Sequence, residues 1–122
     1  MARVVALVPD LMFGSRVLGV VSAAGHEPVL AADADAARRA LPGAELLIVD
    51  LTDDTEARIE QARELRRPDV LLLGFYSHVE AEVRDRAERA GFDLVVPRSR
   101  MAREGDALVA RLLGAGGPAA RD

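Results

Sequence analysis

Two aspartates that follow apolar runs are the residues best suited to chemistry in this sequence. Asp10 follows the run Val4-Val5-Ala6-Leu7-Val8-Pro9, and Asp50 follows Leu46-Leu47-Ile48-Val49. If these runs are neighbouring parallel strands, both carboxylates lie at the edge of the sheet where functional residues gather. There they could hold a hard divalent cation such as Mg²⁺, act as an acid/base pair or provide an aspartyl nucleophile.

Each of these aspartates also has a structural interpretation, because an Asp between a strand and a helix often caps that helix. For Asp10 the two interpretations are balanced. For Asp50 a functional role is favoured, since Asp53 and Asp54 are better placed to cap the next helix. Arg98 should reach across the same mouth toward Asp50, either in a structural ion pair or as a group that senses phosphoryl oxygens.

Ser77 and the two histidines add little catalytic potential. Ser77 and Glu80 have the spacing of a capping box just before an apolar periodic segment, which explains the serine without a catalytic role. His78 is expected in the first turn of that helix, whereas His26 should lie at the opposite end of a strand. Zinc binding and a catalytic triad are therefore excluded for lack of ligands and of geometry.

Strand-like and helix-like segments alternate five times, which predicts an α/β fold with a parallel sheet. Pro28 suggests an edge position for the second strand, and Gly105 should delay or break the last helix. Strands are predicted at 3–8, 27–31, 46–49, 70–73 and 93–96, and helices at 11–24, 33–41, 52–66, 79–90 and up to 113.

Composition excludes several classes of protein. The 122 residues carry a net charge of −4, contain no cysteine, and hold only three Phe and one Tyr. Disulfide scaffolds and thiolate chemistry are thus excluded, and stacking platforms or broad phosphate-binding surfaces for nucleic acid are not expected. No apolar run reaches the length of a membrane span. We expect a cytoplasmic protein with one domain over 1–113 and a flexible tail over 114–122.

The order and spacing of these segments resemble a response-regulator receiver domain from residue 3 to about 113. Leu46-Leu47-Ile48-Val49-Asp50-Leu51 resembles its phosphoacceptor strand, and Val95-Val96-Pro97-Arg98 resembles its fifth-strand passage. The resemblance implies a flavodoxin-like (βα)5 sandwich with strand order 2-1-3-4-5. It also implies Asp50 as phosphoacceptor, with Mg²⁺ held by Asp10, Asp50 and the backbone carbonyl of Thr52.

The sequence departs from that family at several positions that carry functional residues in the family. Pro9 stands where the family has a second acidic residue, Arg98 replaces its lysine, and Gly74 or Ser77 takes its Ser/Thr position. These departures predict an atypical, pseudo-receiver-like domain that binds Mg²⁺ weakly if at all and is not an enzyme.

The predicted function is that of a stand-alone signalling module of the two-component or phosphorelay type. It would contact a histidine kinase, an output protein or a second copy of itself, with phosphorylation of Asp50 weak, altered or absent. One alternative is a phosphorylatable regulator in which Asp10, Asp53 or Asp54 completes the metal site. Another is a small flavodoxin-like ligand-binding domain.

Overall fold

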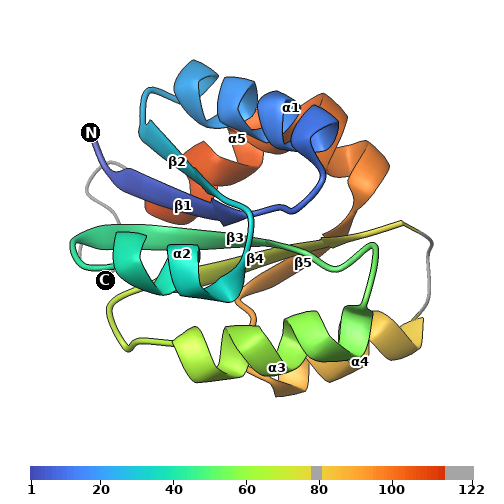
Figure 1. Cartoon of the computed structure of the whole chain (residues 1–122). Coiled ribbons are helices and arrows are strands. Elements are labelled where there is room, and N and C mark those ends of the chain that lie inside the picture. Colours follow the sequence, from blue (N-terminus) through green and yellow to red (C-terminus); the bar gives the residue numbers. More distant parts are fainter. Residues whose placement is uncertain (78–80, 115–122) are drawn as a thin grey trace.

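The computed structural model describes residues 1–77 and 81–114, and these form five strands and five helices in strict alternation (Figure 1). The elements are β1 (Arg3–Leu7), α1 (Leu11–Ala23), β2 (Glu27–Ala31), α2 (Ala34–Ala40), β3 (Ala44–Asp50), α3 (Thr55–Leu65), β4 (Leu71–Tyr76), α4 (Ala81–Arg89), β5 (Leu94–Pro97) and α5 (Arg98–Leu113).

All five strands join one parallel sheet in the order β2-β1-β3-β4-β5, as predicted. β2 is an edge strand, which agrees with the position inferred from Pro28. In the centre of the sheet, Val5 of β1 lies opposite Leu47 of β3, and Asp50 lies opposite Phe75 of β4. Because every strand runs the same way, from left to right in Figure 1, their carboxyl ends lie along one edge of the sheet.

Helices cover both faces of the sheet, so the central strands are apolar throughout rather than alternating. α1 and α5 pack on one face with Val4, Leu46 and Leu73, and α2, α3 and α4 pack on the other (Figure 1). The apolar residues of the central strands are buried, with exposed fractions of 0% for Leu47 and Val49 and 1% for Leu72, and Val70 just before β4 is 8% exposed.

β4 is longer than predicted and carries Gly74 inside the strand, while Ser77 follows its end. A β-carbon at Gly74 would lie 2.8 Å from the ring of Phe92 and 2.9 Å from the side chain of Leu51. The glycine therefore lets Phe92 pack directly on the strand. His78 and Glu80, and with them the predicted capping box, lie outside the described residues.

The prediction that Gly105 delays or breaks the last helix is wrong, because α5 runs without interruption from Arg98 to Leu113. Gly105 is buried against α1, and a β-carbon there would lie 2.6 Å from Cγ1 of Val20. The glycine thus serves the close approach of the two helices, and packing outweighs its low helix propensity.

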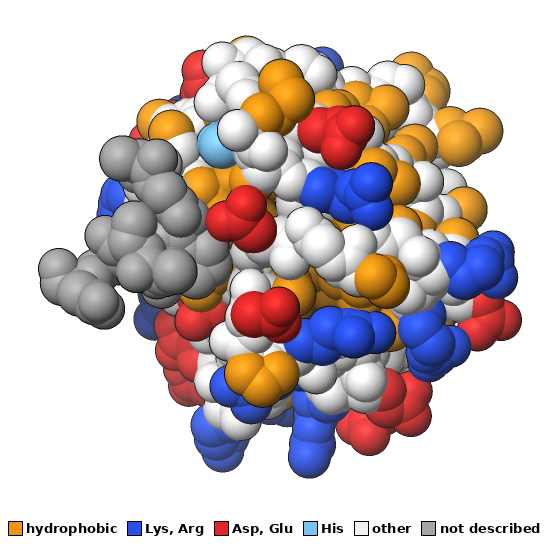
Figure 2. Space-filling model, turned by 90° about the vertical axis from the view of Figure 1, so that its left-hand side faces the viewer, with side chains coloured by type: hydrophobic (Ala, Val, Ile, Leu, Met, Phe, Trp, Pro, Cys, Tyr) orange, Lys and Arg blue, Asp and Glu red, His pale blue; other side chains and the backbone are white. Residues whose placement is uncertain are grey.

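Side chains of both charges are interspersed on the face where the strands begin (Figure 2). Scattered hydrophobic side chains lie among them. Within residues 1–77 and 81–114, no helix has the length and apolar character needed to cross a membrane.

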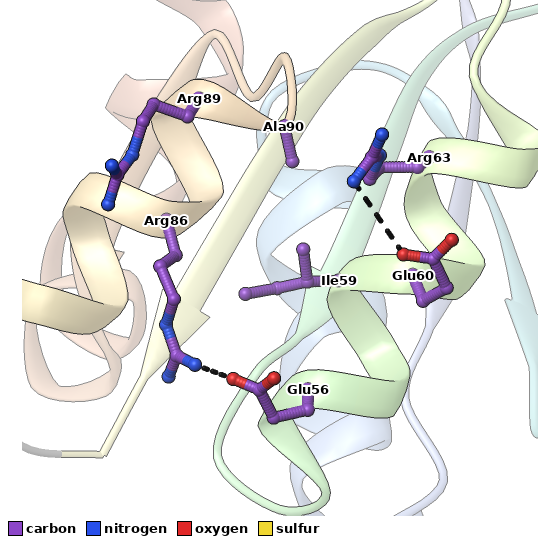
Figure 3. A pocket seen from close by; sticks show the side chains of 7 residues that line it. All are labelled: Glu56, Ile59, Glu60, Arg63, Arg86, Arg89 and Ala90. Atoms are coloured by element: carbon purple, nitrogen blue, oxygen red, sulfur yellow. Dashed lines mark ion pairs between the residues drawn. The ribbon is translucent and has the colours of Figure 1, made fainter.

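A charged groove of about 300 Å³ separates α3 from α4. Glu56 of α3 and Arg86 of α4 point toward each other and form an ion pair across it, and Arg63 pairs with Glu60 along α3 at 3.8 Å (Figure 3). Ile59 points from α3 toward α4 between these charges. The cross-helix pair helps fix α4 beside α3, and so helps position the start of α4 at the carboxyl edge.

Candidate functional site

Asp50 lies at the carboxyl end of the central strand β3 and is only 5% exposed. Its Oδ1 atom accepts two hydrogen bonds from Thr52, one from the backbone N–H at 2.8 Å and one from the hydroxyl at 2.6 Å. Hydrogen bonds to an ionised acceptor are stronger than neutral ones. The carboxylate is therefore held by the loop that follows it.

The loop from Leu51 to Asp54 is closed by further local hydrogen bonds. The Thr55 hydroxyl donates to the carbonyl of Leu51 at 2.7 Å, and Leu51 N–H donates to the carbonyl of Phe75 at 2.8 Å. Asp54 adopts a left-handed conformation with φ of 50°, which Asp tolerates better than most residues. These contacts delay the start of α3 to Thr55 instead of residue 52.

The prediction that Asp53 or Asp54 caps this helix is wrong. Asp54 occupies the N-cap position but its side chain makes no capping hydrogen bond, because its backbone is left-handed rather than extended. Asp53 instead accepts a hydrogen bond from the backbone N–H of Asp54 at 3.1 Å. Asp50 is therefore singled out as a functional residue only by its position at the end of β3.

Asp10 caps α1, as the structural interpretation of this residue proposed. Its Oδ1 atom accepts hydrogen bonds from the backbone N–H groups of Met12 at 2.9 Å and Phe13 at 3.4 Å. Its Oδ2 atom lies 4.0 Å from Nη2 of Arg98. Both carboxylate oxygens thus already have cationic or hydrogen-bonding neighbours.

Arg98 pairs with Asp10, and the expected ion pair between Arg98 and Asp50 is not formed. The guanidinium carbon lies 4.3 Å from the centre of the Phe13 ring, which in turn packs against Phe75 with ring centres 4.9 Å apart. α5 begins on the same face of the sheet as α1, so the side chain of its first residue is drawn to the aromatic face and carboxylate there.

The donor set differs from the one that the receiver resemblance implies for Mg²⁺. Pro9 contributes no carboxylate, Asp10 is engaged by α1 and Arg98, and one oxygen of Asp50 is engaged by Thr52. Across the described ranges, no three His, Asp or Glu side chains are grouped to hold a metal ion. Hard cations depend on several oxygen ligands, so a divalent ion here would compete with the guanidinium of Arg98.

Ser77 lies exposed just beyond β4 and lines the same pocket as Asp10 and Arg98. Two contributors were missed in the sequence: the Thr52 hydroxyl and the ring of Phe13. An Asp followed two residues later by a Thr is a known local hydrogen-bonding pattern, so Thr52 had a readable signal. Phe13 had none, since its contact with Arg98 joins residues 85 positions apart.

The fold of this chain resembles the fold of solved response-regulator structures. A receiver protein from Burkholderia phymatum is 20% identical over 97% of this chain and 99% of its own, with a TM-score of 0.80. The beryllofluoride-activated DrrB receiver domain is 14% identical over 91% of this chain and 96% of its own, with a TM-score of 0.79.

A third solved structure carries a modified site. It is a response regulator from Burkholderia pseudomallei with a phosphorylated aspartic acid, calcium ion and citrate, 15% identical over 90% of this chain and 65% of its own, with a TM-score of 0.75. No family model and no curated protein matches this chain. At these identities the comparisons establish the receiver-type fold.

Proposed function

We propose that residues 1–113 form a receiver-like signalling domain that works in the cytoplasm by contact with a protein partner, without enzymatic activity. Phosphorylation of Asp50 is weak, altered or absent in this proposal. The partner is a histidine kinase, an output protein or a second copy of the chain. The receiver-type fold supports the signalling assignment, and the contacts of Asp10 support the loss of ordinary phosphorylation.

The observation that carries the proposal is the Asp10–Arg98 contact. In a receiver, the acidic residue after β1 helps to hold the metal ion, and a lysine after β5 grasps the phosphoryl group. Here the residues at those two positions face each other at 4.0 Å, and the guanidinium also rests on Phe13. A phosphoryl group on Asp50 would therefore have to draw Arg98 away from two existing contacts.

A phosphorylatable regulator is the second candidate, favoured by the place of Asp50. This carboxylate stands at the end of β3, and only its Oδ1 atom accepts hydrogen bonds from the described residues. A ligand shifts an equilibrium only through its different interaction with the two states. Phosphorylation would switch this chain only if Arg98 gained more from the phosphoryl group than it lost at Asp10 and Phe13.

The test is ¹⁵N–¹H NMR of the full chain, first with Mg²⁺ and then with beryllofluoride. We expect no Mg²⁺-dependent shifts at sub-millimolar concentration and no saturable beryllofluoride complex at Asp50. Asp69→Asn is the matched control, because it removes an exposed carboxylate that lies before β4, at the opposite edge of the sheet. A beryllofluoride complex in the parent and in Asp69→Asn, but not in Asp50→Asn, would contradict weak phosphorylation and establish the second candidate.

Partner contact needs a separate test. We expect the parent and Asp50→Asn to recover the same kinase or output protein in an affinity purification, because the contact does not need a phosphoryl group. Recovery by the parent and not by Asp50→Asn would overturn phosphorylation-independent contact.

A further inference from the structure

A second pocket lies between the N-terminal ends of α1 and α5; it shares Asp10, Ser77 and Arg98 with the candidate site, but the proposed function assigns it no small-molecule ligand. It has a volume of about 510 Å³, within the usual range for small-molecule sites. Arg16 and Phe13 line it from α1, Arg98 and Ser99 from α5, and Ser77 from the end of β4. Asp50 is not among the residues around it.

The charge of this pocket differs in sign from that of the whole chain. Arg16 and Arg98 give two positive charges and Asp10 one negative charge, which leaves a local balance of +1 against −4 for the chain. Arg16 forms no ion pair with any described residue, whereas the guanidinium of Arg98 lies over the Phe13 ring and 4.0 Å from Asp10. Two guanidinium groups, one of them without such a partner among the described residues, suit a singly charged oxyanion.

The pocket also offers apolar surface for the body of a ligand. Met12 lines it and is 86% exposed, which is unusual for a large apolar side chain. Phe13 and Ala102 supply further apolar contacts. Ligand sites typically combine apolar walls with a few polar groups that fix orientation, and the hydroxyls of Ser77 and Ser99 are such groups here.

We propose that this α1–α5 pocket binds a small organic monocarboxylate that carries an apolar group. The carboxylate pairs with Arg16 and the outer edge of Arg98, the serines donate hydrogen bonds to it, and the apolar group lies on Met12 and Phe13. The groove between α3 and α4 has the same local charge, with three arginines against two glutamates. It is less suited to an anion because Arg63 and Arg86 are paired with Glu60 and Glu56, and Arg89 donates to the carbonyl of Asp85.

The experiment is an NMR titration of the full chain with benzoate, acetate and inorganic phosphate at constant ionic strength. We expect saturable shifts with benzoate at the amides of Phe13, Arg16, Arg98 and Ser99, and weaker binding of acetate, which lacks the apolar body. Phosphate should also bind more weakly than benzoate, because a pocket with one net positive charge does not neutralise a dianion.

Matched variants separate specific binding from a general effect of charge. Arg16→Ala should weaken benzoate binding by about tenfold, and Met12→Ala should weaken benzoate but not acetate. Arg39→Ala removes an exposed arginine from α2 on the other face of the sheet and should bind as the parent does. Equal binding by Arg16→Ala and the parent, or shifts spread over the whole surface, would overturn the proposal.

Two further results test which ligand the pocket prefers and whether binding depends on Asp50. Tighter binding of phosphate than of benzoate would show that the pocket selects charge alone, and the apolar contacts would then play no part. Benzoate binding that persists in Asp50→Asn would show that the pocket acts independently of the acceptor position. The outcome therefore does not depend on whether Asp50 is phosphorylated, so failure here and failure of the signalling proposal are separate results.

Discussion

At the scale of single residues, Thr52 is the main partner of the buried Asp50 carboxylate. We expect Thr52→Val to lower the free energy of unfolding by about 1 kcal/mol, because it removes one of two donors from an acceptor that is 5% exposed. Urea denaturation of the parent and the variant measures this. Thr52→Ser keeps the hydroxyl and should retain most of the stability, and a Ser variant as unstable as the Val variant would contradict the role of the hydrogen bond.

Arg98 also acts at this scale, as the cation that faces Asp10. Pro9→Asp should tighten Mg²⁺ binding modestly, since it restores one carboxylate. Pro9→Asp combined with Arg98→Ala should tighten it further, because the competing guanidinium near Oδ2 of Asp10 is gone. Mg²⁺ titration followed by NMR measures the series. If Arg98→Ala adds nothing to the Pro9→Asp variant, then the guanidinium does not compete with the metal.

At the scale of elements, two glycines give opposite expectations for the same substitution. Gly105→Ala should destabilise the protein by roughly 1–3 kcal/mol, because the new β-carbon would lie 2.6 Å from Val20 where α5 meets α1. Gly19→Ala on α1 meets nothing within 4 Å and should stabilise by up to about 1 kcal/mol through helix propensity. Thermal unfolding of both variants measures the pair. Stabilisation by Gly105→Ala would show that the two helices separate easily.

The elements themselves could be predicted from sequence, because apolar runs and capping residues are local signals. Asp33, a residue type that favours helix N-caps, stands before α2 and accepts a hydrogen bond from the Ala36 N–H at 2.8 Å. The failures have tertiary causes. The low helix propensity of Gly105 suggests a helix break, but Val20 faces it in the structure and explains the glycine. Asp54 has the residue type and position of a cap, but its backbone is left-handed.

At the scale of the whole molecule, both faces of the sheet are sealed by helices, and Val49 lies fully buried beneath α2, α3 and α4. We expect Val49→Ala to cost about 2 kcal/mol or more, from lost burial and from the cavity left behind. Chemical denaturation of this variant, compared with the exposed control Ala32→Gly, measures the effect. A loss well below 1 kcal/mol would mean that the core collapses around the smaller side chain.

The candidate site is less predictable than the fold because it depends on which way side chains from elements far apart in the sequence point. The strand order brings Asp10, Asp50, Ser77 and Arg98 to one edge, as the sequence indicated. Which of them touch is decided by the faces on which α1 and α5 lie. The guanidinium of Arg98 turns to Phe13 and Asp10 on the α1 face, and no local pattern around residue 98 encodes that choice.

The contact between α1 and α5 also bears on how the chain folds during synthesis. α1 is synthesised well before α5, yet Val17 and Val21 of α1 share one core with Leu108 and Val109 of α5. Until α5 has emerged from the ribosome, that face of the nascent sheet stays open to water and to other chains. Such transiently exposed apolar surface promotes aggregation, so a chain interrupted before residue 98 should require chaperone protection to stay in solution.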